Sequence, residues 1–263
     1  MRMLVAVAVA LVPLAPALAE PGSVDWQRKV VRCSGSGAPN LRDAQSNVAV
    51  ARIGAERAAK LDAIRNCLEA LKGVRISGGA TVGGAMAGDP ALRSRVEGVV
   101  KGFKVVDKPR YFSDGGVEMD VEVPLEGVAE AVLPPAPDAA ARPPPAAGGA
   151  TGLLVDARGK GVVPGLAPRV LDENGQEVYS AGTVAPEARK SRGPVAYARD
   201  PDAARRDLAE RIGDRPMVVR ALRTDGADVV IANADADALR KAPPAFLSEG
   251  RVVIVTDGEG VSR

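Results

Sequence analysis

The side chains of this sequence that could take part in chemistry are two cysteines and a scattered set of carboxylates and arginines, without any histidine. A chain without imidazole lacks the usual general base, the Ser–His and Cys–His nucleophile pairs and the commonest zinc ligand. This absence is the strongest argument from composition against a standard hydrolase. We therefore expect no catalytic residue, no metal ligand and no cofactor, and we consider a non-enzymatic protein first.

Carboxylates are the remaining candidates for catalysis. Asp156 and Arg158 end a predicted strand, and Asp172 and Glu173 occupy a predicted turn. Carboxylates at strand ends can pair for acid–base catalysis or bind Ca²⁺, so a carboxylate- or metal-dependent hydrolase is one alternative. The simpler interpretation is that Asp156 forms a structural ion pair with an arginine and that Asp172 shapes its turn.

Glycine and serine patterns point to loops and not to a catalytic site. The glycine-rich segment 78–88 lacks the G-x-x-x-x-G-K-[ST] pattern that binds phosphate. Ser34 and Ser36 stand among glycines, but neither G-x-S-x-G nor S-x-x-K occurs. Both segments are interpreted as surface loops.

A third group resembles, in its spacing, the peptidoglycan-binding motif of OmpA-like domains. Thr224-Asp225, Asn233 and Arg240 match the spacing of that motif, in which an Asp and an Arg hold the charged groups of the wall peptide, a use that suits a carboxylate and a guanidinium. The sequence departs from the motif where Asp228 replaces its glycine and Ala236 its leucine. The alternative is that these residues form turns and helix caps.

Residues 1–19 predict a cleavable secretory signal peptide. Arg2 gives a positive start, the apolar run 3–14 follows, and Ala17-Leu18-Ala19 offers a small-x-small cleavage site before Glu20. The run is too short to span a bilayer. We expect cleavage between Ala19 and Glu20 and a mature chain with neither a lipid anchor nor a transmembrane segment. The expected location is the periplasm, with or without association with the outer membrane.

The two cysteines, Cys33 and Cys67, both lie in the mature part of the chain. An even pair in an oxidising compartment predicts one disulfide, which on the chain-entropy model contributes about 3–4 kcal/mol. The alternative is two buried thiols.

A segment of unusual composition divides the chain into two predicted domains. Residues 134–150 are rich in proline, alanine and glycine and predict a semi-extended linker. The linker separates a first domain at 24–133 from a second at 151–257, and a frayed tail is expected after it. The 35 basic and 33 acidic residues are interspersed, and aromatics make up only 3%. We therefore expect no nucleic-acid partner.

Apolar periodicity predicts an α+β fold, with helices packed on a mostly antiparallel sheet in each domain. The first domain is expected to contain a strand at 24–32, a loop at 34–40, a helix at 41–72, a short strand at 74–76, a mobile loop at 77–88, a helix starting at Asp89-Pro90, and a hairpin of strands 99–112 and 117–123. The predicted apolar stripe of the long helix is Val50, Gly54, Ala58, Leu61, Ile64, Leu68 and Leu71. The second domain is expected to contain strands at 152–157, 168–171, 177–179, 217–222, 229–231 and 252–255, and helices at 201–212 and 235–241.

Three runs of the first domain resemble a known family. WQRKVVRCSGSGAPN at 26–40, ARIGAERAAKLDAIRNCLEALKGVRI at 51–76 and RYFSDGGVEMDVEVPL at 110–125 look like the Lpp-type twenty-kilodalton envelope lipoprotein family, which is similar to the N-terminal domain of the flagellar protein FlgT. The resemblance implies a small α+β domain in an exported envelope protein and brings no catalytic residues. This sequence lacks that family's lipidated cysteine. TGLLVDARG at 151–159 and PRVLDENGQEVY at 168–179 look like a module that follows such domains in other exported proteins.

Together these observations favour an exported, non-enzymatic envelope protein, an interaction or assembly module whose partners are envelope proteins or the cell wall. A flagellar or outer-membrane assembly role is compatible with the resemblance but does not follow from a shared domain. The alternatives are a peptidoglycan-binding protein that acts through its second domain and the hydrolase considered above. The oligomeric state is left open.

Overall fold

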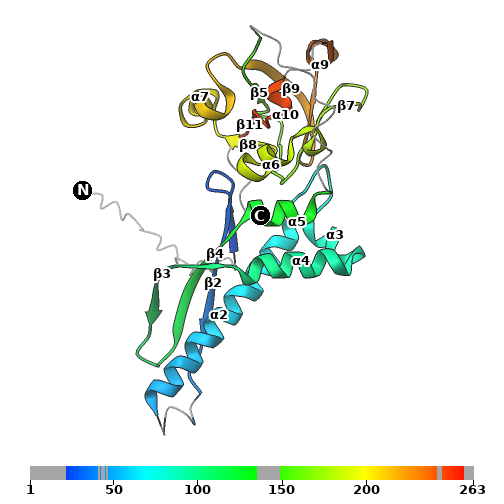
Figure 1. Ribbon diagram of the computed structural model, residues 1–263. Helices are drawn as coiled ribbons and strands as arrows, with labels where there is room; N and C mark the ends of the chain where they lie inside the picture. Colours follow the sequence, from blue (N-terminus) through cyan, green and yellow to red (C-terminus); the bar gives the residue numbers. More distant parts are fainter. Residues whose placement is uncertain are drawn as a thin grey trace, which may run out of the picture.

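The computed structural model describes residues 22–40, 42, 45, 47–134, 149–241 and 245–257. They form an N-terminal unit, residues 22–134, around a four-stranded sheet and a C-terminal unit, residues 149–257, around a seven-stranded sheet (Figure 1). The predicted α+β class in two parts is confirmed. The predicted signal peptide with its Ala19–Glu20 cleavage site, residues 135–148 of the predicted linker and the tail after Asp257 lie outside the described residues.

The N-terminal unit is a sheet with strand order β1-β2-β4-β3, antiparallel throughout. Its elements are β1 (Gly22–Asp25), β2 (Val30–Gly37), α2 (Val48–Gly73), α3 (Val82–Gly88), α4 (Pro90–Lys101), β3 (Lys104–Tyr111), β4 (Val117–Pro124) and α5 (Leu125–Val132). The predicted hairpin turn at 113–116 and the helix capped by Asp89 are confirmed. In β4 the apolar Val117, Met119, Val121 and Val123 are buried, and Asp120 and Glu122 between them are buried as well.

The long helix begins later than predicted. Asn47 caps α2, because its side chain accepts hydrogen bonds from the N–H groups of Ala49 and Val50. From there the helix runs along β2 and β4 on one face of the sheet (Figure 1). Disulfide Cys33–Cys67 joins β2 to α2 and both cysteines are fully buried, so the predicted disulfide is confirmed.

The predicted apolar stripe of α2 is confirmed only toward its C-terminal end, where Leu71 is buried and Ile64 and Leu68 pack partly buried against the core. The helix buries a row spaced by four that consists of Ala51, Ala55, Ala59, Ala63, Cys67 and Leu71, while Leu61 is 68% exposed. The predicted loop at 34–40 is instead largely strand β2, whose Gly35 and Gly37 lie against the helix. A Cβ at Gly35 would overlap the backbone N of Ala63 and O of Ala59. Close contact between a glycine strand and an alanine helix face therefore replaces the large-residue packing that periodicity predicts.

Other segments of this unit also differ from the prediction. The strand expected at 24–32 is two strands with a turn at 26–29 between them. The segment 77–88, expected to be a mobile loop, ends in helix α3 (Val82–Gly88), whose buried Val82 and Met86 hold it on the core. Helix α4 extends through Lys101, so β3 begins at Lys104 and not at Val99.

The C-terminal unit has strand order β7-β6-β10-β9-β5-β11-β8. Its strands are β5 (Leu153–Asp156), β6 (Val170–Leu171), β7 (Glu177–Tyr179), β8 (Ala196–Ala198), β9 (Met217–Asp225), β10 (Asp228–Ile231) and β11 (Val252–Val255). Its helices are the 3₁₀ turn η2 (Ala181–Thr183), α6 (Pro186–Arg192), α7 (Pro201–Asp207), α8 (Ala209–Ile212), α9 (Asn233–Lys241) and α10 (Ala245–Ser248). The helix predicted at 201–212 is broken at Leu208, and β8, α6 and α10 were not predicted.

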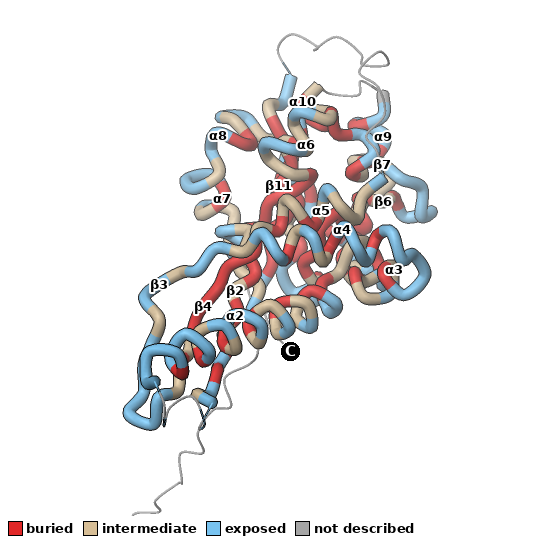
Figure 2. Tube along the Cα trace, turned by 60° about the horizontal axis from the view of Figure 1, so that its bottom comes forward, coloured by how far each residue is buried: buried red, intermediate tan, exposed pale blue. Residues whose placement is uncertain are grey.

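The second sheet is not mostly antiparallel, as was expected, but mixed, with most of its strand pairs parallel. The β9-β5-β11-β8 portion is parallel, β10 is parallel to β6, and the pairs β10–β9 and β6–β7 are antiparallel. Helices α7 and α8 cover one face of the parallel portion through Ala204 and Ile212, while α9 and α10 cover the other. Strands buried on both faces are typical of parallel sheets, and Figure 2 shows β11 buried along its length.

The two units are joined by backbone hydrogen bonds as well as side chains. The N–H groups of Leu166 and Ala167 donate to the carbonyl groups of Arg75 and Ile76 at 2.9 and 2.8 Å, and Ala227 N–H donates to Gly78 O. Arg75 thereby forms a β-bridge with Gly165. The side chain of Leu166 is buried in the hydrophobic cluster of the N-terminal unit.

Candidate functional site

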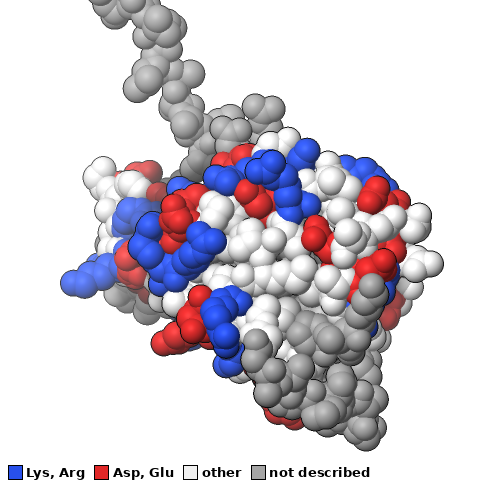
Figure 3. Space-filling model, turned by 90° about the horizontal axis from the view of Figure 1, so that it is seen from above, with Lys and Arg blue, Asp and Glu red and all other residues white. Residues whose placement is uncertain are grey.

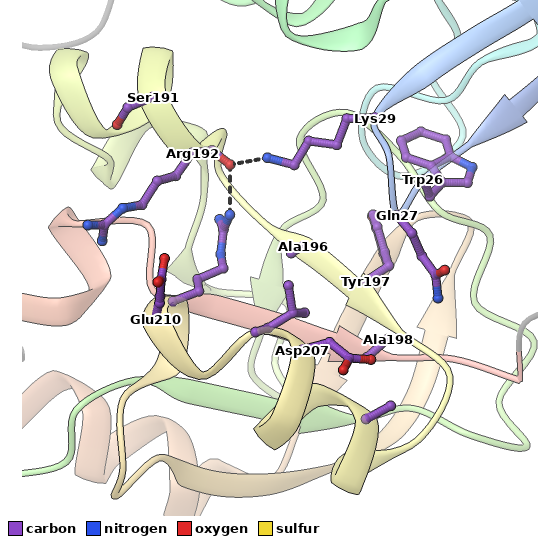
Figure 4. A pocket seen from close by; sticks show the side chains of 13 residues that line it. Trp26, Gln27, Lys29, Ser191, Arg192, Ala196, Tyr197, Ala198, Asp207 and Glu210 are labelled. Carbon is purple, nitrogen blue, oxygen red and sulfur yellow. Dashed lines mark hydrogen bonds between the residues drawn. The ribbon is translucent and has the colours of Figure 1, made fainter.

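A groove of about 410 Å³ opens where the two units meet. We call it the junction groove, and Figure 4 shows its walls. It is lined by Trp26, Gln27, Lys29, Ser191, Arg192, Ala196, Tyr197, Ala198, Ala203, Asp207, Leu208, Glu210 and Arg211. A smaller cavity of about 280 Å³ shares four of these residues, Trp26, Gln27, Tyr197 and Ala198. The groove volume lies in the lower part of the range found for ligand sites, and the volume of the smaller cavity lies just below that range.

One wall of the groove is the turn between β1 and β2. The Asp25 carboxylate accepts hydrogen bonds from the N–H groups of Gln27 and Arg28, which tightens the turn, and Lys29 completes it with φ of 55°. Trp26 meets Tyr197 edge to face with ring centroids 5.5 Å apart. The turn therefore projects from the N-terminal unit and packs its aromatic residue on the C-terminal unit.

Hydrogen bonds of its hydroxyl group fix the position of Tyr197. Its hydroxyl accepts a hydrogen bond from Gly165 N–H at 2.8 Å and donates to Gly165 O at 2.9 Å. Burial raises the pKa of Tyr197 above its ordinary value. The phenol therefore stays neutral and serves as an anchor between strand β8 and the segment that contacts the N-terminal unit.

One end of the groove is basic. The buried Arg211 guanidinium donates to the carbonyl groups of Val252, Arg192 and Gly193, and Lys29 Nζ donates to the same Arg192 carbonyl at 2.5 Å. Burial lowers the pKa of Arg211 to about 10, and burial followed by the charge of Arg211 lowers the pKa of Lys29. Both cations therefore cap the C-terminus of α6, where the helix dipole favours positive charge.

The structure does not bring together the three predicted wall-binding residues. Asp225 ends β9 and lies opposite Asp228, the first residue of β10, in the strand register. Asn233 and Arg240 belong to α9, beyond the other end of β10, and both contact the turn after β6. Arg240 bonds to the Asp172 carboxylate at 2.8 Å, and Asn233 exchanges hydrogen bonds with Glu173.

The carboxylates considered for catalysis are separated and neutralised. Asp156 in β5 forms a bidentate pair with Arg158, and Asp172 is paired with Arg240. Strands β9 and β10 lie between β5 and β6, which places the two carboxylates roughly 14 Å apart at ordinary strand spacing. Hydrogen bonds from Arg158 lower the pKa of Asp156, and those of Asp172 to Gln176, Arg240 and Asn174 outweigh burial and lower its pKa as well. Neither carboxylate is tuned as an acid or base near neutral pH.

Within the described ranges, no group of three or more Cys, Asp or Glu side chains has the arrangement of a metal site. In the same part of the chain, every helix is too short or too polar to cross a bilayer. Figure 3 shows basic and acidic side chains interspersed over one face of the molecule, as the composition predicted.

Sequence reasoning missed the junction groove. Its residues come from a turn that lies inside a predicted strand, from the unpredicted strand β8 and from the short helices α6, α7 and α8. The one signal was Trp26, the single tryptophan of the chain. Its polar neighbours Gln27 and Lys29 fit a turn better than the interior of a strand.

Comparison with known protein families gives a match for the C-terminal unit. The family model described as "Treponema pallidum Tp0624, second domain" matches residues 152–258. A search of curated proteins found no match. The C-terminal unit is therefore similar to the second domain of a multidomain Treponema protein.

Proposed function

We propose that this is an exported cell-envelope protein that acts by binding a partner and not by catalysis. The observation that carries the proposal is the junction groove, a preformed concave site at the contact between two units. Its buried polar groups are committed to structural hydrogen bonds, because Tyr197 anchors Gly165 while Lys29 and Arg211 cap α6. Such a wall offers shape and charge to a ligand and no poised nucleophile.

Two further observations support export. The Cys33–Cys67 disulfide belongs to an oxidising compartment, and residues 1–19 have the pattern of a secretory signal. The resemblance of residues 26–127 to an envelope lipoprotein family agrees with this location. A flagellar or outer-membrane assembly role is not part of the proposal, since a shared domain does not transfer a role.

The structure offers less support for cell-wall binding through α9. Arg240 neutralises Asp172, whose side chain is 2% exposed, so release of Arg240 to a wall peptide would leave a buried carboxylate without its partner. We expect Arg240→Ala to destabilise the fold while retention of the protein on purified sacculi stays unchanged. Loss of retention in a folded Arg240→Lys variant would restore the wall-binding alternative.

Two measurements test the proposed function. Mass spectrometry of periplasmic extract should find a mature chain that begins at Glu20 and carries no lipid. Amine-reactive cross-linking in intact cells should join this chain to another envelope protein. An unprocessed chain in the cytosol would contradict export, and substrate turnover by the purified protein, abolished by a point substitution, would contradict a binding role.

A further inference from the structure

We propose that the junction groove receives an extended segment of a partner polypeptide, which adds as a new strand to the free edge of β8. The inference rests on the binding role proposed above and assigns it a site, a mode of recognition and a class of partner. Its first support is the position of β8 at the end of the seven-strand order, paired only with β11 within the described ranges.

All three residues of β8 line the junction groove, and each keeps 6–7% of its surface exposed. Thr256 N–H donates to Ala198 O on the β11 side, and the register pairs Ala198 with Val255. Successive residues of a strand turn their N–H and C=O groups to opposite sides, so both backbone groups of Tyr197 point away from β11. A backbone donor and acceptor that point away from the sheet form a template for another strand.

The walls leave room for an added backbone. Figure 4 shows Ala196, Tyr197 and Ala198 in line along β8, with Trp26 and Gln27 on one side and Asp207 on the other. Two of the lining residues, Ala196 and Ala198, belong to β8 itself, and the lining residue Ala203 of α7 is also small. A new strand lies about 4.8 Å from its neighbour, and the small side chain of Ala203 permits that approach.

The positive charge at one end of the junction groove indicates the direction of the added strand. Lys29 and Arg211 meet at the C-terminus of α6, just before the amino end of β8. Lys29 has Glu126 at 3.7 Å, whereas Arg211 has no carboxylate within ion-pair distance in the described part of the chain. A strand antiparallel to β8 would bring its carboxyl end to these cations. The partner is therefore an extended segment of small or β-branched residues with an acidic side chain or a free carboxylate at that end.

The probe is a phage-displayed library of random heptapeptides, selected on the purified mature protein. Selected peptides should share the alternation of a strand and an acidic carboxyl end. Synthetic copies should slow amide exchange at Tyr197, measured by NMR, because its N–H becomes hydrogen-bonded. N-methylation of the peptide backbone at the central residue should weaken binding at least tenfold.

Two variants narrow the groove from opposite walls. Ala203→Phe lies on α7 and Gln27→Phe on the β1–β2 turn, and each should weaken peptide binding at least tenfold while the circular dichroism spectrum and melting temperature stay near wild type. The matched control is Ala209→Phe, an exposed α8 position that does not line the groove. It should bind like wild type.

Failure to enrich any peptide, or binding that both groove variants retain, would overturn strand addition. Enriched peptides that leave Tyr197 exchange unchanged would do the same, because their contact would lie elsewhere. None of these results depends on where the protein resides in the cell. Signal processing and cross-linking in cells therefore test the proposed function separately.

Discussion

At the scale of single residues, buried charge in this protein is compensated in two ways. Carboxylates are held by arginines, as in the contacts of Asp120 with Arg110 and Arg32 and in the 2.6 Å pair between Asp228 and Arg169. Buried cations at the junction are held by carbonyl groups, as for Arg211. Both arrangements orient structural elements. Carboxylates and arginines that the sequence offers as candidates for catalysis or binding therefore stabilise the fold instead.

Asp120 provides a test of the first arrangement. Hydrogen bonds from Arg110, then Ser34 and Arg32, outweigh burial and hold the pKa of Asp120 far below its ordinary value of 3.8. The charged form is therefore preferred in the folded state, so its stabilisation is complete above pH 3.8 and is lost as pH falls toward the folded-state pKa.

We expect Asp120→Asn to lower the free energy of unfolding by about 2 kcal/mol at pH 7. The difference from wild type should shrink as pH falls below 4, measured by urea denaturation between pH 7 and 3. The exposed Asp202→Asn should change stability by no more than about 0.5 kcal/mol. A difference for Asp120→Asn that is constant down to pH 3 would contradict the assignment.

At the scale of elements, the N-terminal unit depends on the close contact of β2 with α2. Periodicity located the helix but put its buried face on the larger residues. The observed face uses alanines, because Gly35 and Gly37 of β2 let the backbones meet. A pattern method that weights large apolar residues cannot find such a face, since the partner strand determines which residues are covered.

Gly35→Ala tests this contact. The added methyl group would overlap the α2 backbone, so we expect unfolding to be easier by about 3 kcal/mol or more. The matched control is Gly54→Ala within α2, where a Cβ meets nothing within 4 Å. This control should stabilise the protein by about 1 kcal/mol through helix propensity. Urea midpoints that shift in the same direction for both variants would refute the close contact.

The disulfide joins the same two elements, β2 and α2. Cys33 and Cys67 are 34 residues apart, and the double variant Cys33→Ala/Cys67→Ala should lose about 3–4 kcal/mol on the chain-entropy model. Reductant added to the unfolded wild type should lower its stability toward that of the variant. The variant itself should not respond to reductant, and a reductant effect of equal size on both proteins would argue against the pairing.

At the scale of the whole molecule, the two units share core residues. Leu166 of the C-terminal unit is buried in the N-terminal cluster, and Trp26 packs against the clusters of both units. Folding of one unit therefore stabilises part of the other. The junction groove exists only because of this contact, since its walls belong to different units.

Leu166→Ala tests the coupling. We expect a loss of about 3 kcal/mol in the free energy of unfolding, together with a red shift of the fluorescence of Trp26 as the junction loosens. Wild-type transitions followed by Trp26 emission and far-ultraviolet circular dichroism should coincide, and the variant should shift both. The control Val218→Ala, 50% exposed on β9, should leave both unchanged. A shift in only one signal would indicate independent units.

The sequence by itself determined the α+β class, the Cys33–Cys67 pairing, the β3–β4 hairpin and most strands of the C-terminal unit, because these follow from local periodicity, turn residues and a count of cysteines. It also contained the uninterrupted apolar runs 153–155 and 252–255, which are typical of strands buried on both faces. Only the tertiary structure decided the parallel order of those strands, the alanine face of α2 and the junction groove. Each of these depends on which distant segment lies alongside, and the pattern of one segment does not identify its partner.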